Sequence, residues 1–236
     1  MSEWKAKRFW TSATVETVDD GFAVRLDRRD VRTPLKTLLA MPSRALAGGV
    51  AEEWDAQSEV IDPLSMPLTR AANATLDKVI PQQAAVVANL AEYGGTDLLC
   101  YRADGPERLV ARQAAAWDPM LDWADETFGA RLKTTQGVMH VAQPANAVEA
   151  LRSRVAAMTP WELTALSEFV TLSGSLILAL AAMEGRDPEM LWPLSRIDED
   201  WQNEQWGIDE EEAARVAVKR EAFAQAGRYL ALVRAR

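Results

Sequence analysis

The hydrophobic pattern changes once along the chain, and that change limits the folds open to it. In residues 14–33, TVETVDDGFAVRLDRRDVRT, apolar and polar side chains alternate, with Phe22, Val24 and Leu26 on one side. A period of two is typical of a half-buried strand, and DDG and RRD interrupt the alternation at turn spacing. The segment therefore predicts a small antiparallel meander.

Beyond residue 69 the pattern has the period of helices almost to the C-terminus, and its turn signals predict about five to seven of them. SLILALAAM, residues 175–183, predicts a buried helix, because it is far shorter than the roughly 20 residues that cross a bilayer. The last helix is predicted after Asp209, which can cap it, with three glutamates in its first turn. The expected fold class is therefore α+β: a small β-rich N-terminal domain followed by a larger all-α C-terminal domain.

A connector joins these two parts. One helix is predicted from Ser43, whose hydroxyl can cap it, to about Trp54. The following EVIDPLSMPLT, residues 59–69, is expected to run extended, because each of its prolines disfavours helix at the residue before it. We place the domain boundary here, with the β-rich domain and its one helix over residues 1–68 and the all-α domain over residues 69–236.

The connector carries a more specific prediction. We expect it to lie at the junction of the two domains, with Met66 and Leu68 buried. Thr69 is expected to start the next helix, because the two prolines fix an extended approach and RAANATLDKV then follows with a helical period. A connector inside one continuous helix would contradict this.

Charge and cysteine content exclude several classes of protein. The formal net charge of -9 argues against a general nucleic-acid binder, which would carry a basic patch for phosphates. The single cysteine, Cys100, excludes an internal disulfide, and its leucine neighbours predict a core position. MSEWKAKRFW, at the start, has basic residues without the apolar stretch of a secretory signal. We therefore expect a protein of a reducing compartment that does not insert into membranes.

Common catalytic and cofactor motifs are missing. The chain has no GxxxxGK[ST] loop and no GxGxxG after a strand, which argues against nucleotide hydrolysis and dinucleotide binding. The lone histidine, His140, is interpreted as structural or incidental, because a catalytic role would need an orienting carboxylate that spacing alone does not supply. No catalytic residue, cofactor or metal ligand is predicted.

The run RIDEDWQNEQWG, residues 196–207, concentrates carboxylates, amides and two tryptophans. If residues 194–206 form one helix at about 100° per residue, Trp201 shares a face with Leu194 and Ile197, which predicts a buried, structural tryptophan. A second face carries a carboxylate, an amide and an indole together, a combination that can anchor a partner. The candidate partner-binding residues are Asp198, Glu199, Gln202 and Trp206.

Three other interpretations of this run stay open. The indole of Trp206 could cover the helix end near Gly207, with the acids solvated. The carboxylates of residues 198–204 could serve a small-molecule hydrolase, since glycoside hydrolysis needs two acids, although nothing else in the chain indicates a sugar cleft. The chain could also be a structural scaffold without a client. A hydrolase requires two carboxyl groups about 5 to 10 Å apart across a cleft, whereas a chaperone requires a broad exposed patch near Trp206.

Several blocks in one order give a more specific signal than any one of them. The chain resembles the family of ATP synthase assembly chaperones of the ATP-twelve type, which bind the alpha subunit of the catalytic, F-one sector. The resemblance runs from Arg8 to about Arg215. Its blocks are LDRRDVRTP (26–34), AEEWDAQ (51–57), IDPLSMPLTRAANATLD (61–77), GTDLLCYRA (95–103), WDPMLDWA (117–124), GSLILALA (174–181) and DEDWQNEQWG (198–207).

The resemblance implies a β-rich N-terminal domain, an all-α C-terminal domain and a non-enzymatic function. That function is to hold the newly made alpha subunit in soluble form until the beta subunit replaces the chaperone. The family block DE.WQ..WG is the candidate functional element, and it falls here on Asp198, Glu199, Trp201, Gln202, Trp206 and Gly207. Because the chain does not show the targeting presequence of mitochondrial members, which act in the matrix, a bacterial cytoplasm is expected.

Overall fold

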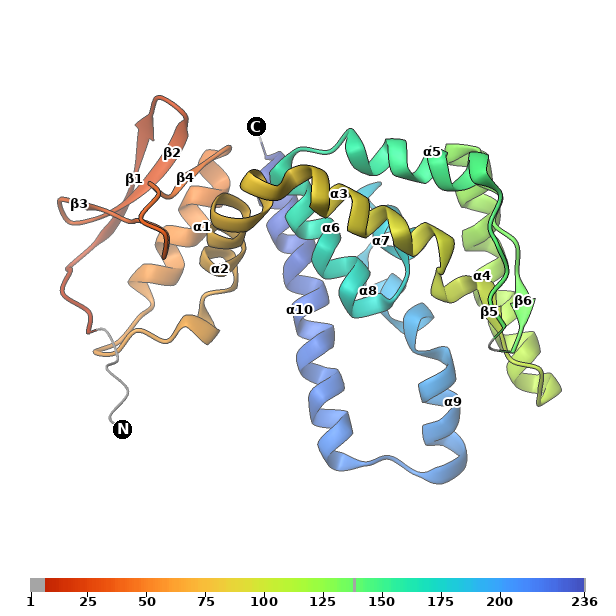
Figure 1. Ribbon diagram of the computed structural model, residues 1–236. Coiled ribbons are helices and arrows are strands. Elements are labelled where there is room, and N and C mark those ends of the chain that lie inside the picture. The colour runs from red at the N-terminus through yellow and green to blue at the C-terminus, as the bar shows by residue number, and fades with distance from the viewer. Residues whose placement is uncertain (1–6, 138, 236) are drawn as a thin grey trace. The chain divides into compact units, whose positions relative to one another are not determined.

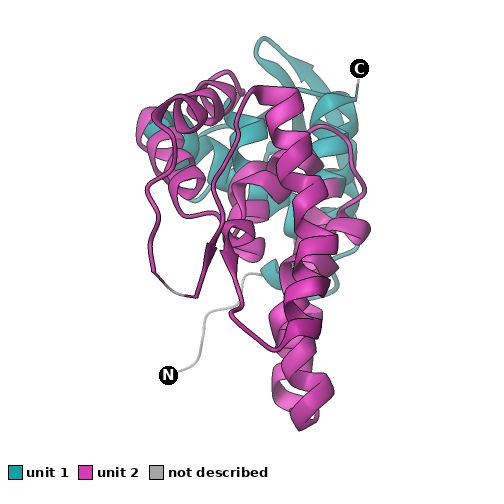
Figure 2. Ribbon diagram, turned by 90° about the vertical axis from the view of Figure 1, so that its right-hand side faces the viewer, with its two compact units in different colours: residues 1–83, 160–164, 228–236 teal, residues 84–159, 165–227 magenta. Residues whose placement is uncertain are grey.

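A computed structural model describes residues 7–137 and 139–235, so the first six residues, on which the expectation about the chain's start partly rests, lie outside the described part. The backbone forms two compact units, coloured separately in Figure 2. Unit 1 comprises residues 1–83, 160–164 and 228–236, and unit 2 comprises residues 84–159 and 165–227. The domain boundary predicted after residue 68 lies inside unit 1 and stays a prediction. The α+β fold class is confirmed, with antiparallel strands near the N-terminus and a mostly helical remainder.

The predicted meander is present in unit 1 (Figure 1). Strands β1 (Ala13–Val18) and β2 (Gly21–Leu26) pair antiparallel across the Asp19–Asp20 turn, with Val15 opposite Val24. The opposite side of β2 pairs with β3 (Arg29–Asp30) and β4 (Ala40–Met41). Helix α1 (Arg44–Asp55) packs on β1 and β2 and buries Val24 with Leu46 and Val50. Alternation thus gave the buried Val24 and Leu26 of β2 correctly, but Phe22 on the same side is only half-buried, and Ala23 on the other side is buried as well.

Helix caps in unit 1 come from near and far in sequence. Ser43 caps α1 as predicted, accepting a hydrogen bond from the Leu46 N–H at 3.1 Å. Helix α2 (Pro67–Ala74) is capped instead by Glu53 of α1, whose carboxylate accepts the N–H groups of Leu68 and Thr69 at 2.7 and 2.8 Å. These donors belong to the first turn of α2, which has no partner inside the helix for them. The Glu53 carboxylate therefore fixes α2 against α1.

The connector prediction is partly confirmed. Met66 and Leu68 are buried, and the segment is not one continuous helix. Two details were wrong: residues 63–65 form a 3-10 turn, η1 (Pro63–Ser65), instead of extended chain, and α2 starts at Pro67 instead of Thr69. Proline is favoured at the first position of a helix, where its missing N–H costs no hydrogen bond, so Pro67 begins the helix instead of delaying it.

After α2 the backbone continues through a π-helical turn, η2 (Thr75–Val79), and a 3-10 turn, η3 (Ile80–Gln82). Pro81 explains the change of winding, because its nitrogen has no hydrogen to donate to the preceding turn. Thr75 is buried there, and its hydroxyl lies 2.7 Å from the Thr164 hydroxyl and 3.0 Å from that of Tyr229. This contact joins the three chain segments that make up unit 1.

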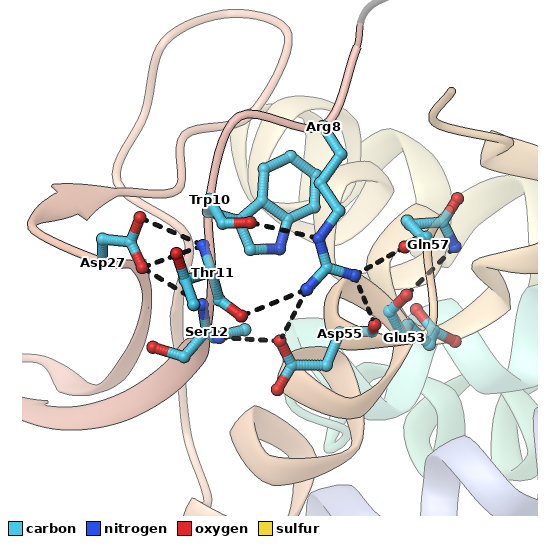
Figure 3. Close-up of polar contacts among 9 residues, drawn as sticks. Arg8, Trp10, Thr11, Ser12, Asp27, Glu53, Asp55 and Gln57 are labelled. Atoms are coloured by element: carbon cyan, nitrogen blue, oxygen red, sulfur yellow. Dashed lines mark hydrogen bonds and ion pairs between the residues drawn. The ribbon is translucent and has the colours of Figure 1, made fainter. Parts of the chain in front are cut away.

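Arg8 ties the N-terminal segment to the end of α1, as Figure 3 shows. Its guanidinium donates to the carbonyls of Asp55 and Gln57, each at 2.6 Å, and to the carbonyl of Trp10 at 3.1 Å. Asp55 also accepts the N–H of Ala13, the first residue of the edge strand β1, at 2.8 Å. A side chain thus occupies a backbone donor that the open edge of the sheet would leave unpaired.

Unit 2 is built from helices around α7 (Leu176–Met183), all eight residues of which are buried, as predicted for SLILALAAM. Cys100 is also buried, as predicted. One short parallel pair, β5 with β6, lies beside the helices. The remaining elements, some of which continue into residues of unit 1, are α3 (Gln83–Glu92), η4 (Tyr93–Gly95), η5 (Leu98–Cys100), β5 (Tyr101–Arg102), α4 (Glu107–Phe128), β6 (Thr135–Gln136), α5 (Ala145–Ala156), α6 (Pro160–Ser173), α8 (Pro188–Leu191), η6 (Trp192–Arg196), α9 (Ile197–Trp206) and α10 (Glu210–Arg234).

A fully buried carboxylate, Asp97, joins two of the sequence blocks named above inside unit 2. One oxygen accepts the Leu99 N–H at 3.0 Å and the Ser175 hydroxyl at 2.8 Å, and the other accepts the Ile177 N–H at 2.9 Å. It therefore caps η5 and α7 together. Burial, which disfavours the charged form, raises the pKa of Asp97 to about 6, and the hydrogen bonds oppose that rise.

Candidate functional site

The acidic run forms helix α9, which ends at Gly207 with a φ of 91°, a left-handed conformation that favours glycine. The following Asp209 caps α10 as predicted, accepting the N–H groups of Glu211 and Glu212 at 2.8 and 3.0 Å. Helix α9 starts at Ile197, because residues 192–196 wind as the 3-10 helix η6. The sequence-based assumption of one regular helix over 194–206 was therefore wrong in its first turn.

The carboxylate of Asp198 is hydrogen-bonded to a buried glutamine of α4. Its Oδ1 accepts a hydrogen bond from Nε2 of Gln113 on α4 at 2.5 Å. The Gln113 Oε1 in turn accepts the N–H of Ala103 at 2.8 Å, and the Gln113 side chain is fully buried. A buried amide that uses both ends in this way has one favourable orientation, so it fixes the position of the carboxylate.

Two exposed ion pairs and one buried indole hold the rest of the run. Arg112 of α4 pairs with Glu204 at 2.7 Å, and Arg196 pairs with Glu199 at 2.9 Å. The buried Trp117 of α4 donates its indole N–H to the carbonyl of Leu194 at 2.7 Å, just ahead of α9. Exposed pairs contribute little to stability, so the buried hydrogen bonds of α4 do most to position α9.

A hollow of about 610 Å³ opens between α9 and the segment that leads into α4. The indole of Trp206 on its rim is 87% exposed, although Trp is a residue type whose surface is usually largely buried. All of the lining belongs to unit 2. The lining residues are Ala103, Gly105, Pro106, Leu109, Asp198, Trp201, Gln202, Gln205 and Trp206.

The structure brings three of the four predicted site residues together at this hollow: Asp198, Gln202 and Trp206. Glu199 is exposed on α9, as expected, but it pairs with Arg196 and is not among the lining residues. Whether any of the four binds a partner stays a prediction.

The prediction for Trp201 was wrong. Its side chain is half-buried and lines the hollow, instead of filling the core. Sequence reasoning also missed Gln113 and the rim residues of the 103–109 segment, because their proximity to α9 depends on how α4 and α9 pack. The only available signal was that the polar Gln113 lies between Leu109 and Trp117, four residues before and four residues after it, on one face of α4.

The chemistry available at the hollow does not match a hydrolase. Asp198 is the one carboxylate among its lining residues, and one of its oxygens is already occupied by Gln113, whereas paired-carboxylate catalysis needs two across the cleft. Across residues 7–137 and 139–235 no group of three or more His, Cys, Asp or Glu side chains could hold a metal ion. His140 is exposed, with its Nδ1 3.2 Å from the Tyr101 hydroxyl.

Comparison with known families decides the relationship. The model of the family described as ATP12 chaperone protein matches residues 7–125. The protein belongs to the ATP12 chaperone family. The crystal structure of Atp12 from Paracoccus denitrificans is 51% identical, with a TM-score of 0.95, and the match covers 98% of this chain and 100% of that one. A mutant of P. denitrificans Atp12p is 50% identical with the same TM-score, covering 99% and 100% of the two chains.

The crystal structure of a protein from Agrobacterium tumefaciens is also similar, at 44% identity and a TM-score of 0.89, and the match covers 95% of this chain and 84% of that one. The two matches to P. denitrificans structures cover 98–99% of this chain and so extend well past residue 125, which means that the chain shares its whole fold with these relatives. None of its helices within the described residues is long and apolar enough to cross a membrane.

Proposed function

We propose that this ATP12 chaperone assists assembly of the ATP synthase catalytic sector by binding the free alpha subunit. The chaperone shields the surface of the alpha subunit until the beta subunit replaces it, and it does so in a bacterial cytoplasm without catalysis. The observation that carries the proposal is the exposed indole of Trp206 beside a hollow with apolar walls. Exposed aromatic side chains at a concave surface are characteristic of protein interfaces.

The free alpha subunit needs such a chaperone because of the surface that it exposes before assembly. A subunit that forms an obligate interface exposes a large apolar surface before its neighbour arrives, and such surfaces aggregate. A chaperone without a nucleotide site has no energy source for release, so the true neighbour must displace it by binding the same surface more tightly. The proposed contact residues are Asp198, Glu199, Gln202 and Trp206.

The direct test is co-expression of the alpha subunit of the same organism with and without this chain. We expect the chain to increase the soluble fraction of the alpha subunit and to co-purify with it. Adding the beta subunit should then release the chain. An alpha subunit that stays equally soluble alone, or a complex that the beta subunit does not dissociate, would contradict the proposal.

Replacing Trp206 with alanine is expected to weaken alpha-subunit binding about 30-fold, because truncating a central aromatic side chain at an interface costs on the order of 2 kcal/mol. The melting temperature should hardly change, since the indole is 87% exposed and contributes little to folding. Isothermal titration of each variant with the purified alpha subunit measures the first effect, and thermal unfolding of the chaperone alone measures the second. Met190→Ala is a matched control, because Met190 is also strongly exposed in unit 2 but lies outside the hollow. Equal losses in both variants would contradict a specific role for Trp206.

Glu199→Gln is expected to weaken capture of the alpha subunit by a few-fold while leaving the melting temperature nearly unchanged. Its carboxylate is exposed, and the glutamine oxygen can still accept a hydrogen bond from the half-buried Arg196 guanidinium, so loss of the charge costs about 1 kcal/mol or less of folding stability. A basic group of the client would lose its attraction to the Glu199 carboxylate at the edge of the interface, and such a charge acts mainly on the association rate and its salt dependence. Stopped-flow association at two salt concentrations checks this. An unfolded variant, or unchanged association, would remove Glu199 from the site.

A further inference from the structure

We propose that the hollow beside α9 binds an extended segment of the client that presents an arginine side chain. In this arrangement the guanidinium stacks on an indole of the hollow and pairs with Asp198, and the flanking backbone bonds to the glutamine amides. The inference rests on the proposed function, because it names the chemistry by which the alpha subunit would be recognised. Three observations support it: the excess of unpaired carboxylates around the hollow, the two tryptophans that line it, and the fixed orientation of the Asp198 carboxylate.

Charge around the hollow favours a cation. The 103–109 segment at the rim carries Asp104 and Glu107, both without a hydrogen bond or ion pair to another described residue. The nearby cations Arg112 and Arg196 are already paired, with Glu204 and Glu199, which leaves Arg108 as an exposed cation of this segment without a partner among the described residues. Together with Asp198, the two unpaired carboxylates outnumber this one free cation, which makes the potential at the hollow negative.

The lining selects a planar cation over a compact one. Trp201 and Trp206 both line the hollow, and no described group accepts a hydrogen bond from either indole N–H. A guanidinium stacks on an indole face through both cation–π and planar contact, whereas an ammonium is a strongly hydrated point charge. The apolar walls at Pro106 and Leu109 can take the methylene stem of the same side chain.

Asp198 is oriented for this contact before any ligand arrives. Gln113 holds its Oδ1, while its Oδ2 accepts no hydrogen bond from the described residues, and the residue lines the hollow. A carboxylate fixed in advance pairs with a guanidinium without losing rotational freedom on binding. Gln202 and Gln205 supply amides that can both donate to and accept from an extended backbone.

Asp198→Asn isolates the charge. The asparagine oxygen can still accept from Gln113, so the fold around the hollow is kept while the negative charge is removed. We expect binding of the purified alpha subunit to weaken at least about tenfold at low salt, and the salt dependence of binding to flatten, because a desolvated charge pair is lost. Glu168→Gln is the control: it removes an exposed carboxylate from α6, away from the hollow, and should bind as the parent does.

Photo-crosslinking identifies the occupant. With a benzophenone amino acid at position 205, in complex with the full alpha subunit, mass spectrometry should find the crosslink in a segment that contains arginine. Replacing that arginine by leucine in the alpha subunit should lower affinity for the parent chain but not for Asp198→Asn. A parent that does not bind the alpha subunit at all would overturn the proposed function. Three outcomes would overturn this inference alone, provided that the parent chain binds the alpha subunit normally. These are the absence of a crosslink from position 205, a crosslink to a segment that lacks arginine, and an unchanged affinity of the Asp198→Asn variant.

Discussion

Replacing Asp97 with alanine is expected to lower the free energy of unfolding by about 4 kcal/mol, because three buried donors lose their acceptor at once. The N–H groups of Leu99 and Ile177 and the hydroxyl of Ser175 all donate to this carboxylate, which has no solvent exposure. Urea unfolding at neutral pH measures the loss, and Asp104→Ala, at an exposed carboxylate of the same unit, should change stability by less than about 0.5 kcal/mol.

The pH dependence of this loss has a definite sign. Burial raises the pKa of Asp97 to about 6 in the folded state, above its value in the unfolded chain. Because the folded state binds a proton on Asp97 more tightly than the unfolded chain does, protonation stabilises the fold. This stabilisation is present in full below the pKa that Asp97 has in the unfolded chain, and it is lost as pH rises through about 6. The stability difference between parent and Asp97→Ala should therefore shrink by about 1 kcal/mol between about pH 5.5 and about pH 7.5. A difference that grows over this interval would contradict the raised pKa.

Asp97 also illustrates what the sequence can and cannot predict. Features that depend on neighbours along the chain were predicted correctly: the alternation of β1 and β2, the Ser43 and Asp209 caps, and the buried helix α7. Features that depend on distant segments were not. The caps supplied by Asp97 and Glu53 join elements separated by up to 80 residues, and no local pattern indicates which carboxylate will do so.

In the candidate site, too, features set by neighbours along the chain were predicted correctly, whereas features set by distant segments were not. The spacing of α9 correctly placed Glu199, Gln202 and Trp206 on its exposed surface. The error in Trp201 has two causes. A 3-10 helix turns about 120° per residue against about 100° for an α-helix, so η6 changes the phase between Leu194 and Trp201. Spacing also cannot tell whether a facing element fills the space above an apolar face, and here the hollow leaves the Trp201 side chain half-buried.

The structural tryptophan next to α9 is Trp117, and replacing it with alanine is expected to cost on the order of 4 kcal/mol of folding stability. Its side chain is only 1% exposed, and the guanidinium of Arg102 lies 5.4 Å from its ring centroid. Both packing and a buried hydrogen bond would be lost. Trp117→Phe separates the two, because it keeps an aromatic ring but leaves the Leu194 carbonyl without its donor.

For Trp117→Phe we expect a smaller loss of about 2 kcal/mol together with a local effect on α9. Because Leu194 lies in η6, directly ahead of α9, the freed carbonyl should loosen the start of that helix, and hydrogen exchange of amides 197–206 should accelerate more than exchange in α7. Trp123→Phe is the matched control: this half-buried indole of α4 contacts Phe128 and Arg186 and donates no hydrogen bond to a described residue. If α9 exchanges equally fast in both variants, the Trp117 hydrogen bond does not position the helix, and the orientation of Asp198 must depend on Gln113 alone.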